Sequence, residues 1–363
     1  MHWLLFLEEV LVPLGLLGWL ALAPAPRGLA FGGQALGTGL LLLALALTAP
    51  WLLVPWWAAL VYGGVWLVLL LVAGRGQTGP GARHPKRWVR PVLFGILGLY
   101  SIWQIGLGWQ GRQLPAAPAV DLLFPLAAGH YLVVSGGTNL TLNPHADVLD
   151  TTIAAHRPWL GTGYALDVVA LDRWGRRARG LVPTSPAAYF IFNTPVLAPC
   201  AGTVLVAQDG RPDMPVPRHD AAYPSGNYLI LRGTRADVVL AHFRRGSLRV
   251  RVGAQVVTWQ LLAQAGNSGA TDEPHLHMHA QRPGPPGFPM GGAPLPMRFQ
   301  GRFLVRNDLV RVPKHPFDAP GSQLVTVPPR GGPTARSQNR LQAPGSAAFL
   351  TVPIPTAPPK NRQ

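Results

Sequence analysis

The chain has 363 residues, of which 48% are hydrophobic and only 13% are charged, and its formal net charge at pH 7 is +16. This length allows two domains, and so apolar a composition excludes an ordinary soluble protein and indicates segments that lie in a membrane. The basic charge favours anionic partners such as lipid headgroups or wall polymers, and no nucleic-acid-binding motif supports nucleic acid as a partner. The single cysteine, Cys200, excludes an intramolecular disulfide.

Apolar runs in the first third of the chain predict four membrane-spanning helices. The runs cover residues 3–23, 36–73 and 92–109, and a helix that crosses a bilayer needs about 20 apolar residues. The middle run is about twice as long as one span needs and contains Pro50 and Pro55, so we expect two spans joined by a tight turn.

The segment between the third and fourth expected spans, residues 74–90, sets the predicted orientation. It contains no acidic residue and five basic ones: Arg75, Arg83, Lys86, Arg87 and Arg90. Cytoplasmic loops of membrane proteins carry an excess of Lys and Arg, so we place this segment in the cytoplasm. The chain after about residue 111 is then expected outside the cytoplasm, as is the N-terminus, with Glu8 and Glu9 near the outer edge of the membrane.

The pattern of apolar and polar residues changes after about residue 130. Short apolar runs alternate with Gly, Pro, Asn and Asp turns, which predicts a mainly antiparallel β domain. The expected strands cover residues 131–134, 164–170, 202–207, 227–231, 237–241, 248–252 and 261–265. The last part of the chain is rich in Pro, Gly, Ala and Ser, and we predict that it is disordered. The expected organisation is a membrane region (residues 1–110), a linker (111–129), the β domain (130–312) and the tail (313–363).

The stretch GNSGATDEPHLHMH, residues 266–279, contains the strongest functional signal. Its histidines stand at alternate positions, which places them on one face of a β-strand: His275, His277 and His279. Leu276 and Met278 then point to the opposite face, toward a core. Imidazole is the commonest metal ligand among side chains and also serves as a general acid or base near neutral pH. Incidental histidines on a surface strand are the less favoured interpretation.

The Pro-His-Leu-His motif at residues 274–277 resembles the signature of the lysostaphin-type zinc endopeptidases, the M23 family. Other stretches resemble that family in the same order along the chain, over roughly residues 130–285: VLAPCAGTV (196–204), SGNYLI (225–230), VVLAHF (238–243) and GNSG (266–269). The resemblance implies a lysostaphin-type peptidase fold, in which residues 196–204 form a β-hairpin at the floor of the cleft.

The resemblance also implies a catalytic zinc ion with three protein ligands. Asp167 and His277 match two of them, although an acid on a solvated strand face is the alternative interpretation of Asp167. Many family members have the first ligand, a histidine, four residues before the aspartate, but that position is Gly163 here. His145 and His156 are the candidates for this ligand, and we favour His145, because the spacing of Asn143 and His145 resembles a subgroup in which the ligand comes from farther upstream.

Two further histidines match the catalytic positions of the family. His242 follows the apolar run 238–241, and His275 is the first histidine of the His-x-His pair. His279 has no role implied by the resemblance, and we expect an exposed histidine at a strand end.

These features predict a membrane-anchored zinc metalloendopeptidase outside the cytoplasm that hydrolyses peptide bonds in peptidoglycan cross-links. One alternative is a catalytically degenerate domain that binds the cell wall or a partner, for which the glycine at position 163 is the main support. Another is a protease that acts on a protein of the cell envelope. The sequence indicates neither the bond cleaved nor the oligomeric state.

Overall fold

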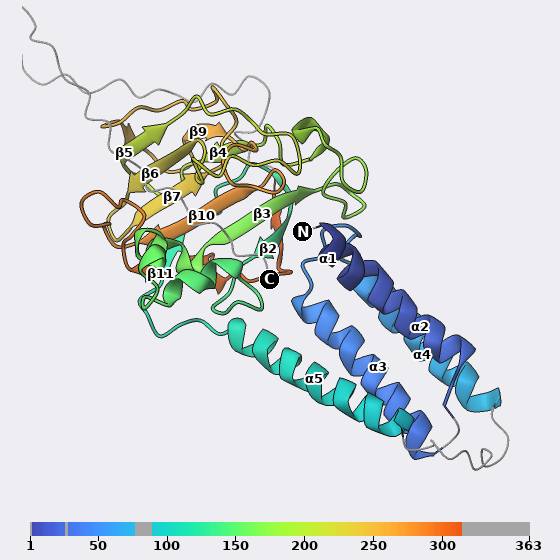
Figure 1. Ribbon diagram of the computed structural model, residues 1–363. Helices are drawn as coiled ribbons and strands as arrows, with labels where there is room; N and C mark the ends of the chain where they lie inside the picture. The colour runs from blue at the N-terminus through green and yellow to red at the C-terminus, as the bar shows by residue number, and fades with distance from the viewer. Residues whose placement is uncertain (1, 26–27, 77–88, 314–363) are drawn as a thin grey trace, which may run out of the picture.

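The computed structural model describes residues 2–25, 28–76 and 89–313, and these form an apolar helical bundle and a β domain (Figure 1). The predicted disordered tail lies, apart from its first residue, outside the described residues. The same holds for three of the five basic residues between the third and fourth spans: Arg83, Lys86 and Arg87.

The helical bundle confirms the prediction of four apolar helices. Among the described residues, four helical stretches are long and apolar enough to cross a membrane: Trp3–Leu22, Leu29–Thr48, Ala58–Arg75 and Val89–Gly111. The first consists of α1 (His2–Phe6), a π-helical turn η1 (Leu7–Leu11) and α2 (Val12–Leu22), and the others are α3 (Leu29–Thr48), α4 (Ala58–Gly76) and α5 (Val89–Gly111).

The break between α3 and α4 falls where the two prolines predict it, and Glu9 holds it in place. The Glu9 side chain is fully buried. Its carboxylate accepts hydrogen bonds from the backbone N–H groups of Leu52 (2.8 Å), Leu53 (2.8 Å) and Val54 (3.1 Å). A buried acid is costly unless it is hydrogen-bonded, so these bonds explain how an apolar helix accommodates Glu9.

The β domain is built on one large antiparallel sheet with the strand order β14-β2-β3-β10-β7-β6-β5-β8. A further strand of this sheet, β11, pairs with β10. Its strands are β2 (Gly129–Ser135), β3 (Leu166–Leu171), β5 (Gly202–Gln208), β6 (Tyr228–Arg232), β7 (Asp237–Ala241), β8 (Gln255–Val256), β10 (Leu276–Gln281), β11 (Pro294–Leu295) and β14 (Leu309–Val312). Smaller sheets contain β4 (Pro195–Leu197) with β9 (Leu261–Gln264), and β1 (Val120–Leu122) with β12 (Met297–Phe299) and β13 (Arg302–Phe303). The predicted mainly antiparallel domain is confirmed; β1 and β12 form a parallel pair.

Two local predictions about strands are wrong. Residues 248–252 form no strand: Leu248 and Val250 pack on the core, so their alternation reflects packing and not strand pairing. Residues 196–204 do not form a hairpin, because β4 pairs with β9 whereas β5 pairs with β6 and β8. The turn between β4 and β5 therefore carries the chain from one sheet to another.

The two faces of the large sheet have different surroundings, as alternation along a strand requires. On one face, Leu166, Leu240, Leu276 and Met278 belong to the main hydrophobic core, as predicted for the last two. The opposite face carries Asp167, His277 and His279. Two 3₁₀ segments, η2 (Pro144–Leu149) and η3 (Ala154–Tyr164), connect β2 to β3. A third, η4 (Pro186–Ala188), lies in the loop before β4.

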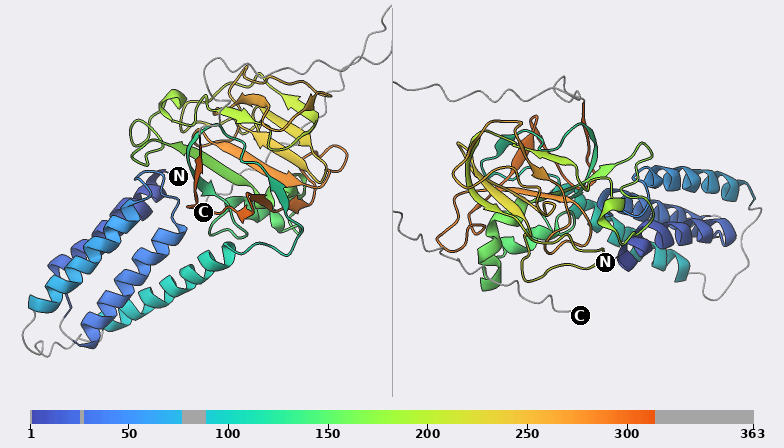
Figure 2. Two further views of the ribbon diagram at one scale, coloured as in Figure 1. Left: turned by 180° about the vertical axis from the view of Figure 1, so that it is seen from behind. Right: turned by 90° about the horizontal axis from the view of Figure 1, so that it is seen from above.

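The β domain lies at the end of the bundle that also contains the N-terminus (Figures 1 and 2). Leu5 and Leu52 of the membrane region pack with Leu132 of β2 and Val169 of β3 in one buried cluster. Trp57 Nε1 donates a hydrogen bond to the carbonyl of Trp174 at 2.9 Å. The helical region and the β domain are thus joined by side-chain contacts as well as by the chain after α5.

Candidate metal centre

The centre of the site is formed where β3 and β10 lie side by side. Their antiparallel register places Asp167 directly opposite His277. Residues opposite each other in such a pair lie close enough for their side chains to interact, and His277 Nδ1 lies 2.9 Å from Asp167 Oδ1. Both side chains are largely buried, with 8% of Asp167 and 6% of His277 exposed.

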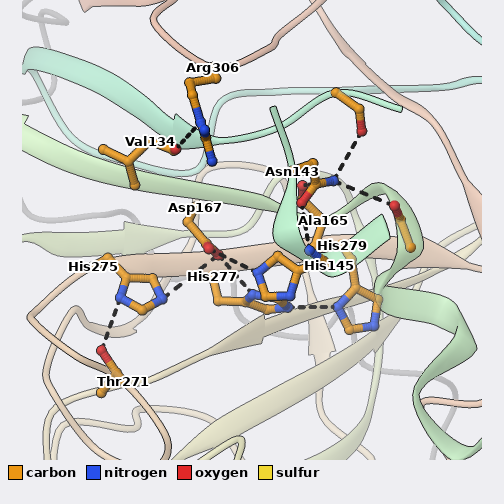
Figure 3. A network of polar contacts seen from close by, with 12 residues as sticks. Val134, Asn143, His145, Ala165, Asp167, Thr271, His275, His277, His279 and Arg306 are labelled. Carbon is orange, nitrogen blue, oxygen red and sulfur yellow. Dashed lines mark hydrogen bonds and ion pairs between the residues drawn. The ribbon is translucent and has the colours of Figure 1, made fainter. Parts of the chain in front are cut away.

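His145 reaches the same carboxylate from η2. Its Nε2 lies 2.9 Å from Asp167 Oδ2 (Figure 3). Asn143, fully buried at the start of η2, positions the segment: its side-chain oxygen accepts from the His145 N–H, and its amide donates to the carbonyls of Gly137 and Ala165. The Asn143 amide therefore ties the histidine segment to the residues that lead into β3.

The two upstream candidates lie in different places in the structure. His145 lies against Asp167, whereas His156 contacts the carbonyl of Asp150 at the surface through its Nδ1. The departure at Gly163 also has a steric reason, because a Cβ there would overlap the side chain of Leu149 in η2. A side chain at position 163 would therefore require Leu149 to move.

Two further imidazoles flank this group, His242 after β7 and His275 before β10. Their ring centroids lie 4.7 Å apart, and His275 Nε2 is 3.7 Å from Asp167 Oδ1. His242 adopts a left-handed backbone conformation (φ 64°), and its Nδ1 donates to the Ser268 carbonyl at 2.8 Å. His275 Nδ1 lies 2.9 Å from the Glu273 carbonyl. In both rings Nδ1 donates to a backbone carbonyl, so Nε2 of the neutral ring carries no proton and is available to a ligand.

The charge states suit metal binding. Burial raises the pKa of Asp167, but the His145 and His275 rings and the hydrogen bonds from His145 and His277 outweigh it and hold that pKa well below its usual range. Burial lowers the pKa of His277, and burial together with His275 and His277 lowers the pKa of His242 well below its usual value. A carboxylate and neutral imidazoles are the forms that bind metals.

His279 differs from the sequence expectation, which was an exposed strand-end residue. Only 1% of it is exposed, and its Nδ1 lies 3.0 Å from His277 Nε2. Burial lowers the pKa of His279 well below its usual value, and the Gln281 side chain opposes this shift. His279 is buried because it shares the β10 face that η3 covers, and alternation alone cannot show which face is covered.

Sequence reasoning also missed a buried ion pair that supports His275. Arg177 Nε lies 2.7 Å from Glu273 Oε1, and the exposed fractions of the two side chains are 3% and 5%. The backbone carbonyl of Glu273 is the group that faces His275 Nδ1. The two residues stand 96 positions apart, and the only available signal was an acid beside the His-x-His motif with no assigned partner.

His145, Asp167 and His277, here termed the ligand cluster, have the chemistry of a metal site. Their candidate ligand atoms all lie within 4.8 Å of one another. Two imidazole nitrogens and one carboxylate oxygen fit a catalytic zinc site, which uses three protein ligands and keeps a further position open. The ligand cluster therefore fits a zinc ion.

Residues 189–289 match the sequence model of Peptidase family M23. His242, His275 and His277 fall within the matched residues, whereas His145 and Asp167 lie upstream of them. No curated protein matches the chain.

Among solved structures, the chain is similar to lysostaphin from Staphylococcus simulans, with 20% identity and a TM-score of 0.22 over 32% of this chain and 36% of that one. A zinc-containing peptidase from Vibrio cholerae has 20% identity and a TM-score of 0.20 over 32% and 46% of the two chains. The catalytic domain of a prophage-encoded M23 protein from Enterococcus faecalis has 17% identity and a TM-score of 0.22 over 34% and 69%. The chain thus spans less than two thirds of the first two structures.

Proposed function

We propose that this chain is a membrane-anchored zinc metalloendopeptidase that hydrolyses peptide bonds in peptidoglycan cross-links outside the cytoplasm. The observation that carries the proposal is the ligand cluster with two further imidazoles beside it, in a chain with an M23 domain. A zinc ion held by His145, Asp167 and His277 would lower the pKa of a bound water and polarise the scissile carbonyl.

The flanking histidines supply the proton transfers in this proposal. With Nδ1 bonded to a backbone carbonyl, each ring presents Nε2 toward the site. A neutral Nε2 accepts a proton from the attacking water, and a protonated one donates a hydrogen bond to the oxyanion that develops on the substrate. Burial of His242 favours its neutral form, which suits a base, so we assign His242 and His275 as the catalytic residues.

The arrangement of the helices supports a domain outside the cytoplasm. The end of α4 and the start of α5 lie at the far end of the bundle from the β domain (Figure 1), and they carry Arg75 and Arg90. With the basic end in the cytoplasm, the N-terminus, the turn between α3 and α4 and the β domain all lie on the opposite side, where peptidoglycan is found. This proposed orientation makes the bilayer the anchor of the enzyme.

The degenerate-domain alternative loses its main support, since the histidine missing at position 163 has a counterpart in His145. The decisive experiment is digestion of purified sacculi by the full chain in detergent. We expect soluble peptide fragments from the wild type, none from His275→Ala, and wild-type activity from the surface control His156→Ala. Intact sacculi with all three proteins would refute the peptidoglycan assignment, and cleavage of an envelope protein instead would identify the other substrate class.

A further inference from the structure

Three successive positions on the face of β10 opposite the main core carry polar side chains. His277, His279 and Gln281 lie on one face of the strand, and their exposed fractions are 6%, 1% and 0%. His277 Nε2 lies 3.0 Å from His279 Nδ1 (Figure 3). At the other end of the row, the Gln281 amide nitrogen donates a hydrogen bond to the carbonyl of Pro289 at 2.6 Å.

Two buried atoms of this row have no hydrogen-bond partner among the described residues, namely His279 Nε2 and Gln281 Oε1. A buried polar atom without a partner costs about 1–3 kcal/mol. The two atoms belong to neighbouring positions on the same strand face. A Cβ at position 161 would overlap Gln281 Oε1, so Gly161 provides the space in which the amide oxygen lies.

The direction of the contact between the two imidazoles changes when His277 binds a metal. Without a metal, His277 Nδ1 lies 2.9 Å from Asp167 Oδ1, which can only accept, so Nδ1 carries the proton of the neutral ring. An imidazole that gives its Nδ1 lone pair to a metal keeps its proton on Nε2. His277 Nε2 would then donate to His279 Nδ1, which lies 3.0 Å away.

We propose that His279 is a positioning residue that accepts from His277 Nε2 and so favours the tautomer and ring orientation in which His277 binds a metal through Nδ1. The inference rests on the proposed function, because it assigns His277 as a ligand. A ligating imidazole commonly donates its second N–H to a neighbouring acceptor, and loss of such an acceptor typically costs 10- to 100-fold in metal affinity. Here a second histidine serves as that acceptor.

The test compares two side chains of similar shape at position 279. In His279→Asn, the amide oxygen takes the place of Nδ1 as an acceptor, whereas His279→Leu offers no acceptor. We expect zinc affinity, measured on the full chain in detergent by competition with a chromophoric chelator, to fall roughly 10- to 100-fold in His279→Leu. His279→Asn should bind close to the wild type. An equal loss in the Leu and Asn variants would assign the residue to packing alone and overturn the proposal.

A second measurement reports on the contact itself. In the zinc-loaded protein, nitrogen-15 spectra of labelled histidine should show the His277 Nε2 proton at a hydrogen-bonded shift in the wild type and not in His279→Leu. The same Nε2 shift in both proteins would overturn the proposal. Zinc binding that requires His277 but is unchanged in His279→Leu would refute only the positioning role. A wild-type chain that binds no zinc would refute the proposed function.

Discussion

Asp167 connects the imidazoles of the site. Its two oxygens face His145 and His277 at 2.9 Å, and His275 lies 3.7 Å from one of them. The carboxylate is buried, so its charge is only weakly screened by water and influences each ring strongly. Its neighbours come from η2 and β10 and from the turn before β10, and residues distant in the sequence therefore meet at one side chain.

The identity of the first ligand can be tested by zinc content. We expect purified wild type to contain about one zinc per chain, as a three-ligand catalytic site implies. His145→Ala and His277→Ala should each lose it, because each removes one of the three ligands. His156→Ala should retain it, since that ring lies at the surface. Elemental analysis of the purified chains measures the content, and zinc retained in His145→Ala would contradict the assignment.

Loss of Arg177 from its buried pair with Glu273 should lower stability far more than loss of Arg176 from its surface pair with Asp172. Arg177→Met leaves the Glu273 carboxylate buried without its partner, and breaking a buried pair in this way costs about 3–5 kcal/mol. Arg176→Met, which breaks the half-exposed contact with Asp172, should cost about 0–1 kcal/mol. Thermal unfolding in detergent compares the two variants, and equal shifts in melting temperature would contradict the prediction.

At the scale of elements, the turn between α3 and α4 depends on one buried acid. Glu9→Leu removes the acceptor of three backbone N–H groups, one in a buried and two in partly buried contacts. A buried donor left unpaired costs about 1–3 kcal/mol. Glu8→Leu is the matched control, because the Glu8 side chain accepts none of the hydrogen bonds of the described residues. We expect a large fall in the melting temperature of the full chain for Glu9→Leu and a small one for Glu8→Leu. A reversed order would show that the turn is held in another way.

The connection from β2 to β3 illustrates a second element-scale constraint. η2 and η3 pack so closely that a side chain at position 163 would overlap the present position of the Leu149 side chain. Gly163→His introduces the histidine that many members of the M23 family, which this chain resembles, have at this position. We nevertheless expect this variant to have lower stability and lower zinc affinity, because the new side chain displaces η2 and with it His145. Chelator competition and thermal unfolding measure both effects. Improved zinc affinity in this variant would contradict the packing argument.

At the scale of the whole molecule, the β domain satisfies carbonyl groups at the end of α3. Arg306 Nη1 donates to the carbonyls of Thr48 and Thr141 at 2.9 Å, and its Nε donates to Val134 at 3.0 Å. Burial lowers the pKa of Arg306 to about 10, which leaves it protonated at neutral pH. The last carbonyls of a helix need such partners, so the guanidinium joins α3 to β2.

Loss of this guanidinium should loosen the junction between helices and domain. Arg306→Met leaves those carbonyls without their donor, and we expect faster hydrogen exchange in β2 and a lower melting temperature of the full chain. Arg302→Met is the control, because its guanidinium is mostly exposed and lies 3.7 Å from Asp308. Unchanged exchange in Arg306→Met would show that the apolar contacts of Leu5 and Leu52 hold the junction without it.

The sequence by itself determined the helical region and the histidine strand, because both patterns are local. The lengths of apolar runs and the prolines at 50 and 55 predict the spans, and alternation predicts that His277 and Met278 face opposite sides of β10. Tertiary structure decided the rest. The position of His145 against Asp167, the burial of His279 and the pairing of Arg177 with Glu273 depend on which distant segments cover each face. Residues 248–252 repeat the alternation of a strand without pairing as one, since packing on a core imposes the same period as a sheet.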